Sequence, residues 1–215
     1  MLVDVFPVGP IQANCVLVGD PAAGVVAVID PGEEAERISE RIRSSGLEPR
    51  MILHTHGHVD HAGGTGELFE LLGGGITVGL HRDEEELYRN LAVQGSMFGL
   101  EVAAPPDPDL WLEHGQRIGL GGLELEVRHT PGHSPGGVCF VVDGGPERVV
   151  VAGDVLFAGS IGRTDLWGGS FDVLARSIRE QLYTLPEETR VVCGHGPDTT
   201  IGDEKRSNPF VRGEG

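Results

Sequence analysis

The chain has 215 residues, 39% of them hydrophobic, and its 33 Asp and Glu against 16 Lys and Arg give a net charge of -17. This excess of negative charge repels polyanions and argues against a nucleic-acid partner. The apolar runs fall short of the ~20 residues that span a bilayer, and the opening residues MLVDVFPVGP lack the parts of a secretory signal, so we expect a soluble cytoplasmic protein that binds no membrane.

The first half of the chain alternates short β-branched runs with helical patterns. The first three runs are separated by Gly and Pro, so we expect them to pair as antiparallel strands. An acidic run, Asp83 to Glu86, opens the last of these helices and is interpreted as a solvated first turn. In chain order the predicted elements are strands at 3–6, 15–19 and 25–30, a helix at 33–44, a strand at 51–53, a helix at 61–72, a strand at 76–79 and a helix at 82–91.

The second half repeats this order of strands followed by helices. Two such halves predict an α/β fold with two packed sheets and helices outside, a four-layer αββα sandwich. No linker-like stretch divides the chain, so we expect one domain over residues 1–215. The predicted elements here are strands at 110–112, 117–120, 123–129, 137–142 and 149–151, a helix at 171–182, a strand at 190–193 and a short helix at 202–205.

The main chemical signal is the run Thr55-His56-Gly57-His58-Val59-Asp60-His61, at a predicted strand-to-helix junction. Residues i and i+2 of an extended segment point the same way, so His56 and His58 can offer nitrogens to one metal ion. Asp60 and His61 lie past the bend and are expected to point to a second position a few Å away. One loop can therefore supply ligands to two ions.

Two ions need more ligands, and three more candidates follow other predicted strands. His133 follows the strand at 123–129, Asp154 follows the strand at 149–151, and His195 follows the strand at 190–193. We assign His133 to the ion of His56 and His58, His195 to the ion of Asp60 and His61, and Asp154 as a carboxylate that bridges both. Each ion keeps an open position.

Imidazole and carboxylate ligands without thiolate suit zinc, iron or manganese, and we expect two divalent ions, zinc first. Such ions, ~3.5–4 Å apart, lower the pKa of a bridging water toward neutrality and polarise the carbonyl that it attacks. The ligand set therefore predicts a hydrolase for a carbonyl derivative.

With these residues the sequence resembles the metallo-β-lactamase superfamily over nearly the whole chain. Within it, the sequence is most similar to glyoxalase II, the hydroxyacylglutathione hydrolases, and to their short bacterial relatives. The segments that carry the resemblance, besides 56–61, are Ile29-Asp30-Pro31-Gly32, Thr130-Pro131-Gly132-His133-Ser134, Gly153-Asp154, Gly162-Arg163-Thr164-Asp165, Gly194-His195-Gly196-Pro197 and Asn208-Pro209-Phe210.

The resemblance implies a thioesterase that acts on S-acylglutathione or a related thioester through a metal-bridging hydroxide. It also implies that Asp30 supports the ligands from behind, and it makes Asp60 a candidate to orient the attacking water. Longer glyoxalase II enzymes carry a C-terminal helical extension for glutathione, which this chain is expected to lack. Arg163 is the remaining candidate to bind a substrate carboxylate, the alternative being a pair with Asp165.

Several alternatives stay open. A persulfide dioxygenase of the same fold uses one iron, and a lactonase of this fold is also a hydrolase. Trp167 is either a wall of the substrate site or an ordinary packing residue. The remaining histidines and the cysteines are not assigned as ligands, and the cysteines are expected to be buried free thiols. These residues are His54, His81, His114, His129, Cys15, Cys139 and Cys193.

Overall fold

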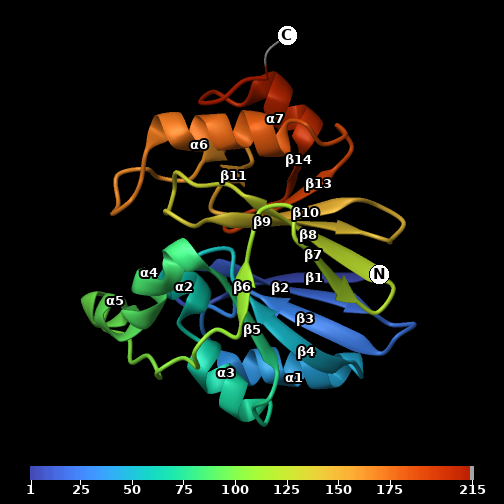
Figure 1. The fold of residues 1–215 in the computed structure, drawn as a ribbon, viewed down its shortest axis with the longest axis vertical. Coiled ribbons are helices and arrows are strands. Elements are labelled where there is room, and N and C mark those ends of the chain that lie inside the picture. Colours follow the sequence, from blue (N-terminus) through green and yellow to red (C-terminus); the bar gives the residue numbers. More distant parts are fainter. Residues whose placement is uncertain (214–215) are drawn as a thin grey trace.

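Two six-stranded sheets lie face to face at the centre of the structure (Figure 1), a computed structural model that describes residues 1–213. The first sheet follows chain order, with antiparallel pairs among its first three strands, as predicted, and parallel pairs thereafter. Its strands are β1 (Leu2–Val8), β2 (Ala13–Asp20), β3 (Val25–Ile29), β4 (Glu48–Leu53), β5 (Thr77–His81) and β6 (Leu110–Leu112).

The second sheet is mostly antiparallel and has the order β14-β13-β10-β9-β8-β7. Only the β10–β13 pair is parallel. Its strands are β7 (Arg117–Leu120), β8 (Leu123–His129), β9 (Val138–Asp143), β10 (Val149–Gly153), β13 (Arg190–Cys193) and β14 (Thr199–Thr200). A small hairpin of β11 (Leu156–Phe157) and β12 (Ser160–Ile161) follows β10. β11, β12 and β14 have only two residues each and were not predicted from the sequence.

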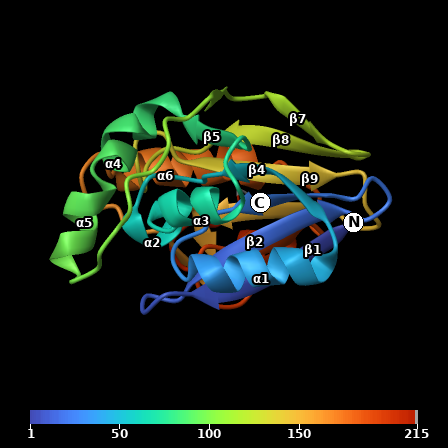
Figure 2. The ribbon, with the colours of Figure 1, turned by 90° about the horizontal axis from the view of Figure 1, so that it is seen from below.

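Helices cover the outer faces of both sheets. In Figure 1 α6 and α7 lie above the second sheet, and the view from below in Figure 2 shows α1 and α3 across the first sheet. The helices are α1 (Ala35–Ser45), α2 (Val59–Ala62), α3 (Thr65–Leu71), α4 (Glu85–Arg89), α5 (Leu91–Met97), α6 (Phe171–Ser177), which continues as a π-helical turn over Ile178–Leu182, and α7 (Ile201–Ser207). The arrangement confirms the predicted four-layer αββα sandwich.

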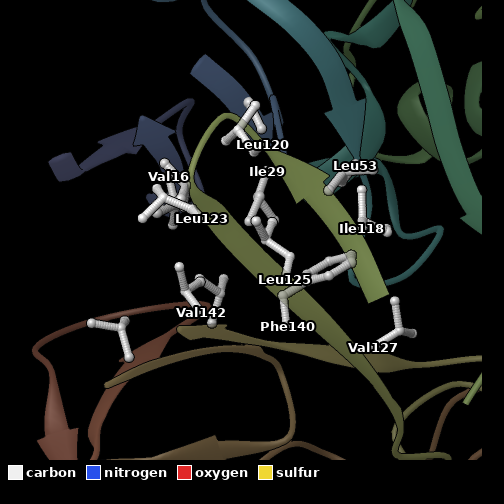
Figure 3. Packing of buried hydrophobic residues seen from close by; sticks show 14 of the residues in the cluster. Val16, Ile29, Leu53, Ile118, Leu120, Leu123, Leu125, Val127, Phe140 and Val142 are labelled. Atoms are coloured by element: carbon white, nitrogen blue, oxygen red, sulfur yellow. The ribbon is translucent and has the colours of Figure 1, made fainter. Parts of the chain in front are cut away.

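Alternation of side chains along the strands produces this layering. In β9, Phe140 and Val142 point into the core between the sheets, whereas Cys139 and Val141 point outward into a core shared with α6. Figure 3 shows the central core, where Phe140 and Val142 lie near Leu125 of β8. Both faces of the central strands are thus buried, which is why they appear in the sequence as continuous apolar runs.

Two predicted helices differ from the observed ones. The helix expected at 61–72 is divided into α2 and α3 at Gly63 and Gly64. A side chain at Gly64 would collide with the Pro31 carbonyl oxygen, so close packing on the loop after β3 requires glycine where the helix is interrupted. The helix expected at 82–91 begins instead as a 3-10 turn, Arg82–Glu84, before α4, and the chain then forms the unanticipated α5. Within residues 1–213, no helix is long and apolar enough to traverse a bilayer.

Candidate metal centre

The structure brings all seven predicted ligands together at one edge of the sandwich, where strands of both sheets end. Backbone hydrogen bonds join the sheets there, from Val138 N to Thr55 O at 2.8 Å and from Asn14 N to Gly194 O at 2.7 Å. The loop after β4 and the short helix α2 that follows it supply four of the predicted ligands, and the segments after β8, β10 and β13 supply one each. The seven are His56, His58, Asp60, His61, His133, Asp154 and His195.

These side chains form the two groups that the spacing predicts. One ligand atom from each of His56, His58 and His133 lies within 4.8 Å of the others. Asp60, His61 and His195 satisfy the same limit. Each group offers three donors in a compact set, which leaves room for further ligands on an ion.

Asp154 lies between the two groups and turns one oxygen toward each. Its Oδ1 is 3.3 Å from His61 Nε2 and 3.6 Å from His195 Nε2. Its Oδ2 is 3.7 Å from His133 Nε2. A carboxylate with one oxygen on each side has the geometry of a bridging ligand between two cations.

Asp30 orients the histidine loop from behind. Its Oδ1 accepts a hydrogen bond from Thr55 N at 2.7 Å, and its Oδ2 accepts from Thr55 Oγ1 at 2.6 Å and from His61 Nδ1 at 2.9 Å. Since the Thr55 hydroxyl gives its proton to Asp30, it can accept one from His56 Nδ1, 3.0 Å away. In both histidines Nδ1 is therefore the nitrogen that faces this support, and Nε2 is directed to the centre.

Main-chain carbonyls orient two more histidines in the same way. His133 Nδ1 donates to Arg163 O at 2.8 Å, and His195 Nδ1 donates to Gln12 O at 3.3 Å. Each therefore directs Nε2 inward. His58 is turned the other way, with its Nδ1 3.0 Å from His133 Nε2. Two nitrogens so close, both needed as lone-pair donors, suit a shared cation better than a hydrogen bond between them.

Two buried polar atoms of the centre have no hydrogen-bond partner among the described residues, His56 Nε2 and Asp154 Oδ1. Burying a lone pair without a partner costs free energy, so such atoms are rare unless a ligand satisfies them. A cation satisfies both. The donor set and these two orphaned atoms therefore fit divalent ions at both groups.

The electrostatics also prepare the groups for metal binding. Burial, with the nearby His133, lowers the pKa of His58 to about 4, so its ring is neutral at pH 7. Burial acts to raise the pKa of Asp60, but His61 and His195 outweigh it and hold that pKa below its usual range. Burial acts to lower the pKa of His61, but the negative charges of Asp154 and Asp60 outweigh it and raise that pKa. The Asp60 group thus holds protons that a cation would displace.

Glycines allow the main chain to approach the ligands closely. A side chain at Gly194 would collide with Asp154 Oδ1, and a side chain at Gly162 would collide with the Asp154 carbonyl oxygen. Neither position leaves space for a Cβ atom. Gly194, before His195, is therefore explained by packing against Asp154, whereas Gly196, after it, has φ 71° and is explained by its left-handed backbone conformation.

Glu84 is a residue of the centre that the sequence analysis missed, and the prediction of a solvated acidic turn was wrong for it. Its side chain is fully buried, and its two oxygens accept from Gly57 N at 2.7 Å and Gly136 N at 2.6 Å. Burial raises the pKa of Glu84, and these two N–H groups oppose the rise. One carboxylate thereby joins the loop of His56 and His58 to the loop of His133. The spacing of Glu84, Tyr88 and Leu91 along one helical face was the signal that could have revealed it.

Two amides, also missed, hold the ligand loops in place. Gln94 of α5 donates to Gly57 O at 3.1 Å and accepts from Val59 N at 3.1 Å, so it binds both sides of His58. Asn14, buried in β2, donates to Cys193 O at 2.9 Å and to Gly196 O at 3.0 Å, on either side of His195. No sequence spacing indicated either contact. The contacts of Asn14 join segments distant along the chain, and Gln94 belongs to α5, a helix that was not predicted.

A cavity of about 490 Å³ opens over the metal centre. Arg163 and Trp167 both line it, together with His58, Asp60 and His195. The Arg163 guanidinium forms two hydrogen bonds with the Asp165 carboxylate, at 2.7 and 2.8 Å. The alternative considered for Arg163, pairing with Asp165, is therefore present. A role of Arg163 toward a substrate carboxylate stays a prediction.

The histidines left unassigned have other partners. Buried His54 lies 3.0 Å from Gly79 O and 2.7 Å from Thr65 Oγ1. His81 and His129 stack with ring centroids 4.2 Å apart, and His129 Nε2 faces Pro135 O at 3.3 Å. The cysteines are buried free thiols, as predicted.

Comparison with known proteins identifies the family. Residues 8–195 match the model of the Metallo-beta-lactamase superfamily. The chain is 43% identical over 211 residues to a Bacillus subtilis protein named probable metallo-hydrolase YqgX, covering 97% of this chain and 96% of that one. It is 40% identical over 212 residues to a Haemophilus influenzae protein named hydroxyacylglutathione hydrolase GloC, covering 98% of each.

Solved structures agree. The fold matches BLEG-1 B3 metallo-beta-lactamase with a TM-score of 0.87 at 36% identity, covering 99% of this chain and 100% of that one. It matches TTHA1623 in a di-iron-bound form with a TM-score of 0.86 at 41% identity, covering 97% and 100%. It matches ETHE1 from Myxococcus xanthus with a TM-score of 0.78 at 29% identity, covering 100% and 86%. The chain is therefore a member of the metallo-beta-lactamase superfamily, with the fold of a metal-dependent hydrolase and clustered His and Asp side chains that could hold metal ions.

Proposed function

We propose that this protein is a dinuclear metal-dependent thioester hydrolase of the glyoxalase II type. The observation that carries the proposal is the position of Asp154, whose two oxygens face the two histidine groups separately. A bridging carboxylate favours a pair of ions over a single one. When bound, two divalent ions supply an activated water and Lewis acidity toward a carbonyl, which is sufficient for hydrolysis without a protein nucleophile.

The side chains of this protein have distinct tasks in such a reaction. Asp30 and Thr55 fix the ring orientations of His56 and His61, as their hydrogen bonds indicate. Asp60 has its Oδ2 3.3 Å from His195 Nε2 and lines the cavity, where it is placed to accept a hydrogen bond from the attacking water. Since the same carboxylate is a proposed ligand, Asp60→Asn is expected to lower kcat and metal content together.

The name of the Haemophilus relative, a hydroxyacylglutathione hydrolase, supports the thioester as the bond that is cleaved. The di-iron form of TTHA1623 supports a dinuclear centre and leaves iron beside zinc and manganese as the native metal. A lactone is the nearest competing substrate, because it presents the same kind of carbonyl. A persulfide dioxygenase reaction requires one iron and predicts sulfite as the product.

One experiment separates these functions. The purified holoenzyme is analysed for its metals and assayed on lactoylglutathione, neutral thioesters, a lactone and a persulfide. The proposal expects about two ions per chain and turnover of thioesters that a chelator abolishes. One iron per chain with sulfite released from the persulfide alone would refute it, and preference for the lactone by a large factor in kcat/KM would reassign the substrate.

A further inference from the structure

The cavity over the metal centre has walls of exposed apolar side chains. Phe98 is 61% exposed, Trp167 57% and Met97 79%. Of the nine exposed large hydrophobic side chains in residues 1–213, five line this one cavity. These five are Ile11, Met97, Phe98, Leu166 and Trp167. Apolar side chains gathered at one concave place, rather than scattered, mark a surface that binds an apolar group.

The walls come from two parts of the fold. Met97 and Phe98 lie at the end of α5, and Leu166 and Trp167 lie in the loop that follows β12. His58 and Asp154 line the same cavity. A substrate whose carbonyl reaches the centre must therefore extend across one or both apolar walls.

The cavity has few positively charged side chains that could bind an anionic group of a substrate. Arg163 is the single Lys or Arg among its lining residues, and its guanidinium is already paired with Asp165 through two hydrogen bonds. The chain as a whole carries a net charge of -17. Glutathione presents two carboxylates, and with the one Arg of these walls already paired, burying those carboxylates here costs hydration that no free cation of the lining offsets.

We infer, resting on the proposed thioesterase function, that the substrate is a thioester with an uncharged, apolar acyl group that lies on the Phe98 and Trp167 walls, joined to a carrier that needs no carboxylate recognition. Burial of each methylene on such a wall is worth about a two- to fourfold gain in kcat/KM, with the upper figure for full burial. The cavity of about 490 Å³ accommodates a chain of several carbons beside the carbonyl.

The test uses the metal-loaded enzyme and two matched substrate series. The first varies the acyl group from acetyl to octanoyl on N-acetylcysteamine, a neutral thiol, and adds succinyl as an anionic counterpart of butanoyl. The second carries the same acyl groups on glutathione. We expect kcat/KM to rise with each methylene until the cavity is filled, and butanoyl to exceed succinyl by about tenfold or more.

Variants connect this preference to the walls. Phe98→Ser and Trp167→Ser are expected to flatten the dependence on chain length while leaving metal content unchanged. Phe210→Ser is the control, because Phe210 is 52% exposed and does not line the cavity. Calorimetric binding of a non-hydrolysable S-octyl thioether gives a readout apart from turnover, and its negative heat-capacity change should shrink in both wall variants.

The outcomes separate failure of the proposed function from failure of the apolar-acyl inference. If no thioester is hydrolysed, the proposed function fails. If thioesters are hydrolysed but the rates are independent of acyl length, or are higher for succinyl or for the glutathione series, the proposed function stands and the apolar-acyl inference is overturned. A change of oligomeric state in the wall variants, measured by sedimentation, together with an unchanged dependence on acyl length, would assign the walls to a second copy and also overturn it.

Discussion

Replacing Glu84 with Gln tests whether one buried carboxylate holds the two ligand loops together. Glutamine has nearly the same shape, but it can present an oxygen to only one of the two N–H groups, Gly57 N and Gly136 N, that Glu84 now accepts. The other N–H then faces an NH₂ group in a site with no exposure to solvent. The substitution therefore leaves a buried donor unsatisfied.

The size of the effect follows from these two bonds. An unsatisfied buried donor costs about 1–3 kcal/mol, and loss of the charge on the acceptor weakens the remaining bond by about 1 kcal/mol. A neutral amide costs less free energy to bury than a carboxylate, which offsets part of this loss. The net decrease in the free energy of unfolding is about 2 kcal/mol. For a chain of this size, that corresponds to a fall in Tm of about 4–8 °C.

The same substitution should weaken metal binding, because Gly57 lies between two proposed ligands and Gly136 lies on the loop of His133. Loss of such supporting contacts typically costs about 10- to 100-fold in metal affinity. The assays are thermal unfolding by circular dichroism and competition with a chromophoric chelator. Glu86→Gln is the matched control, because Glu86 belongs to the same acidic run and is exposed. Equal Tm values and equal metal affinities for the two variants would refute the reasoning.

Three further predictions concern metal removal, pH and surface charge. Chelation should lower Tm by about 5–10 °C, since ions at 100 times their Kd contribute about 2.7 kcal/mol, and an unchanged Tm in a protein shown to contain metal would contradict this. Burial raises the pKa of Cys139 and of Cys193 to about 12 from 9.0, so the native state keeps protons that the unfolded chain releases. The free energy of unfolding should therefore keep its full contribution from these thiols below pH 9.0 and fall as the pH rises toward 12. Urea midpoints measured across this range check this, and a Cys139→Ala, Cys193→Ala double variant should show a smaller fall. Asp165→Asn should free Arg163 and raise kcat/KM for succinyl but not butanoyl thioesters by about two- to fivefold, whereas an equal change for both would show that the pair does not govern charge selectivity.

Local features of the sequence were enough to predict the layered fold and the seven clustered residues. β-Branched runs between Gly and Pro indicate the strands. Candidate ligands that follow strands can be recognised because strand ends direct side chains to one edge of a sheet. The spacing from His56 to His61 also separates the two ligand groups. The side chains of His56 and His58 project from an extended segment, and those of Asp60 and His61 project from the helix that follows, in another direction. These properties depend on neighbours along the chain, so the sequence contains them.

Contacts between distant segments were decided only by the tertiary structure. Glu84 belongs to an acidic run, and its burial depends on the loops of Gly57 and Gly136 closing over it from different sheets. The helix predicted at 61–72 was divided where Gly64 packs closely on Pro31 and Gly63 packs on Gly32, positions that leave no room for a larger side chain. The apolar walls arise from the same cause, since Phe98 and Trp167 face one cavity only after α5 and the loop after β12 are placed beside the metal centre. Whether a side chain meets water, backbone or substrate is set by what covers it, and that partner lies elsewhere in the chain.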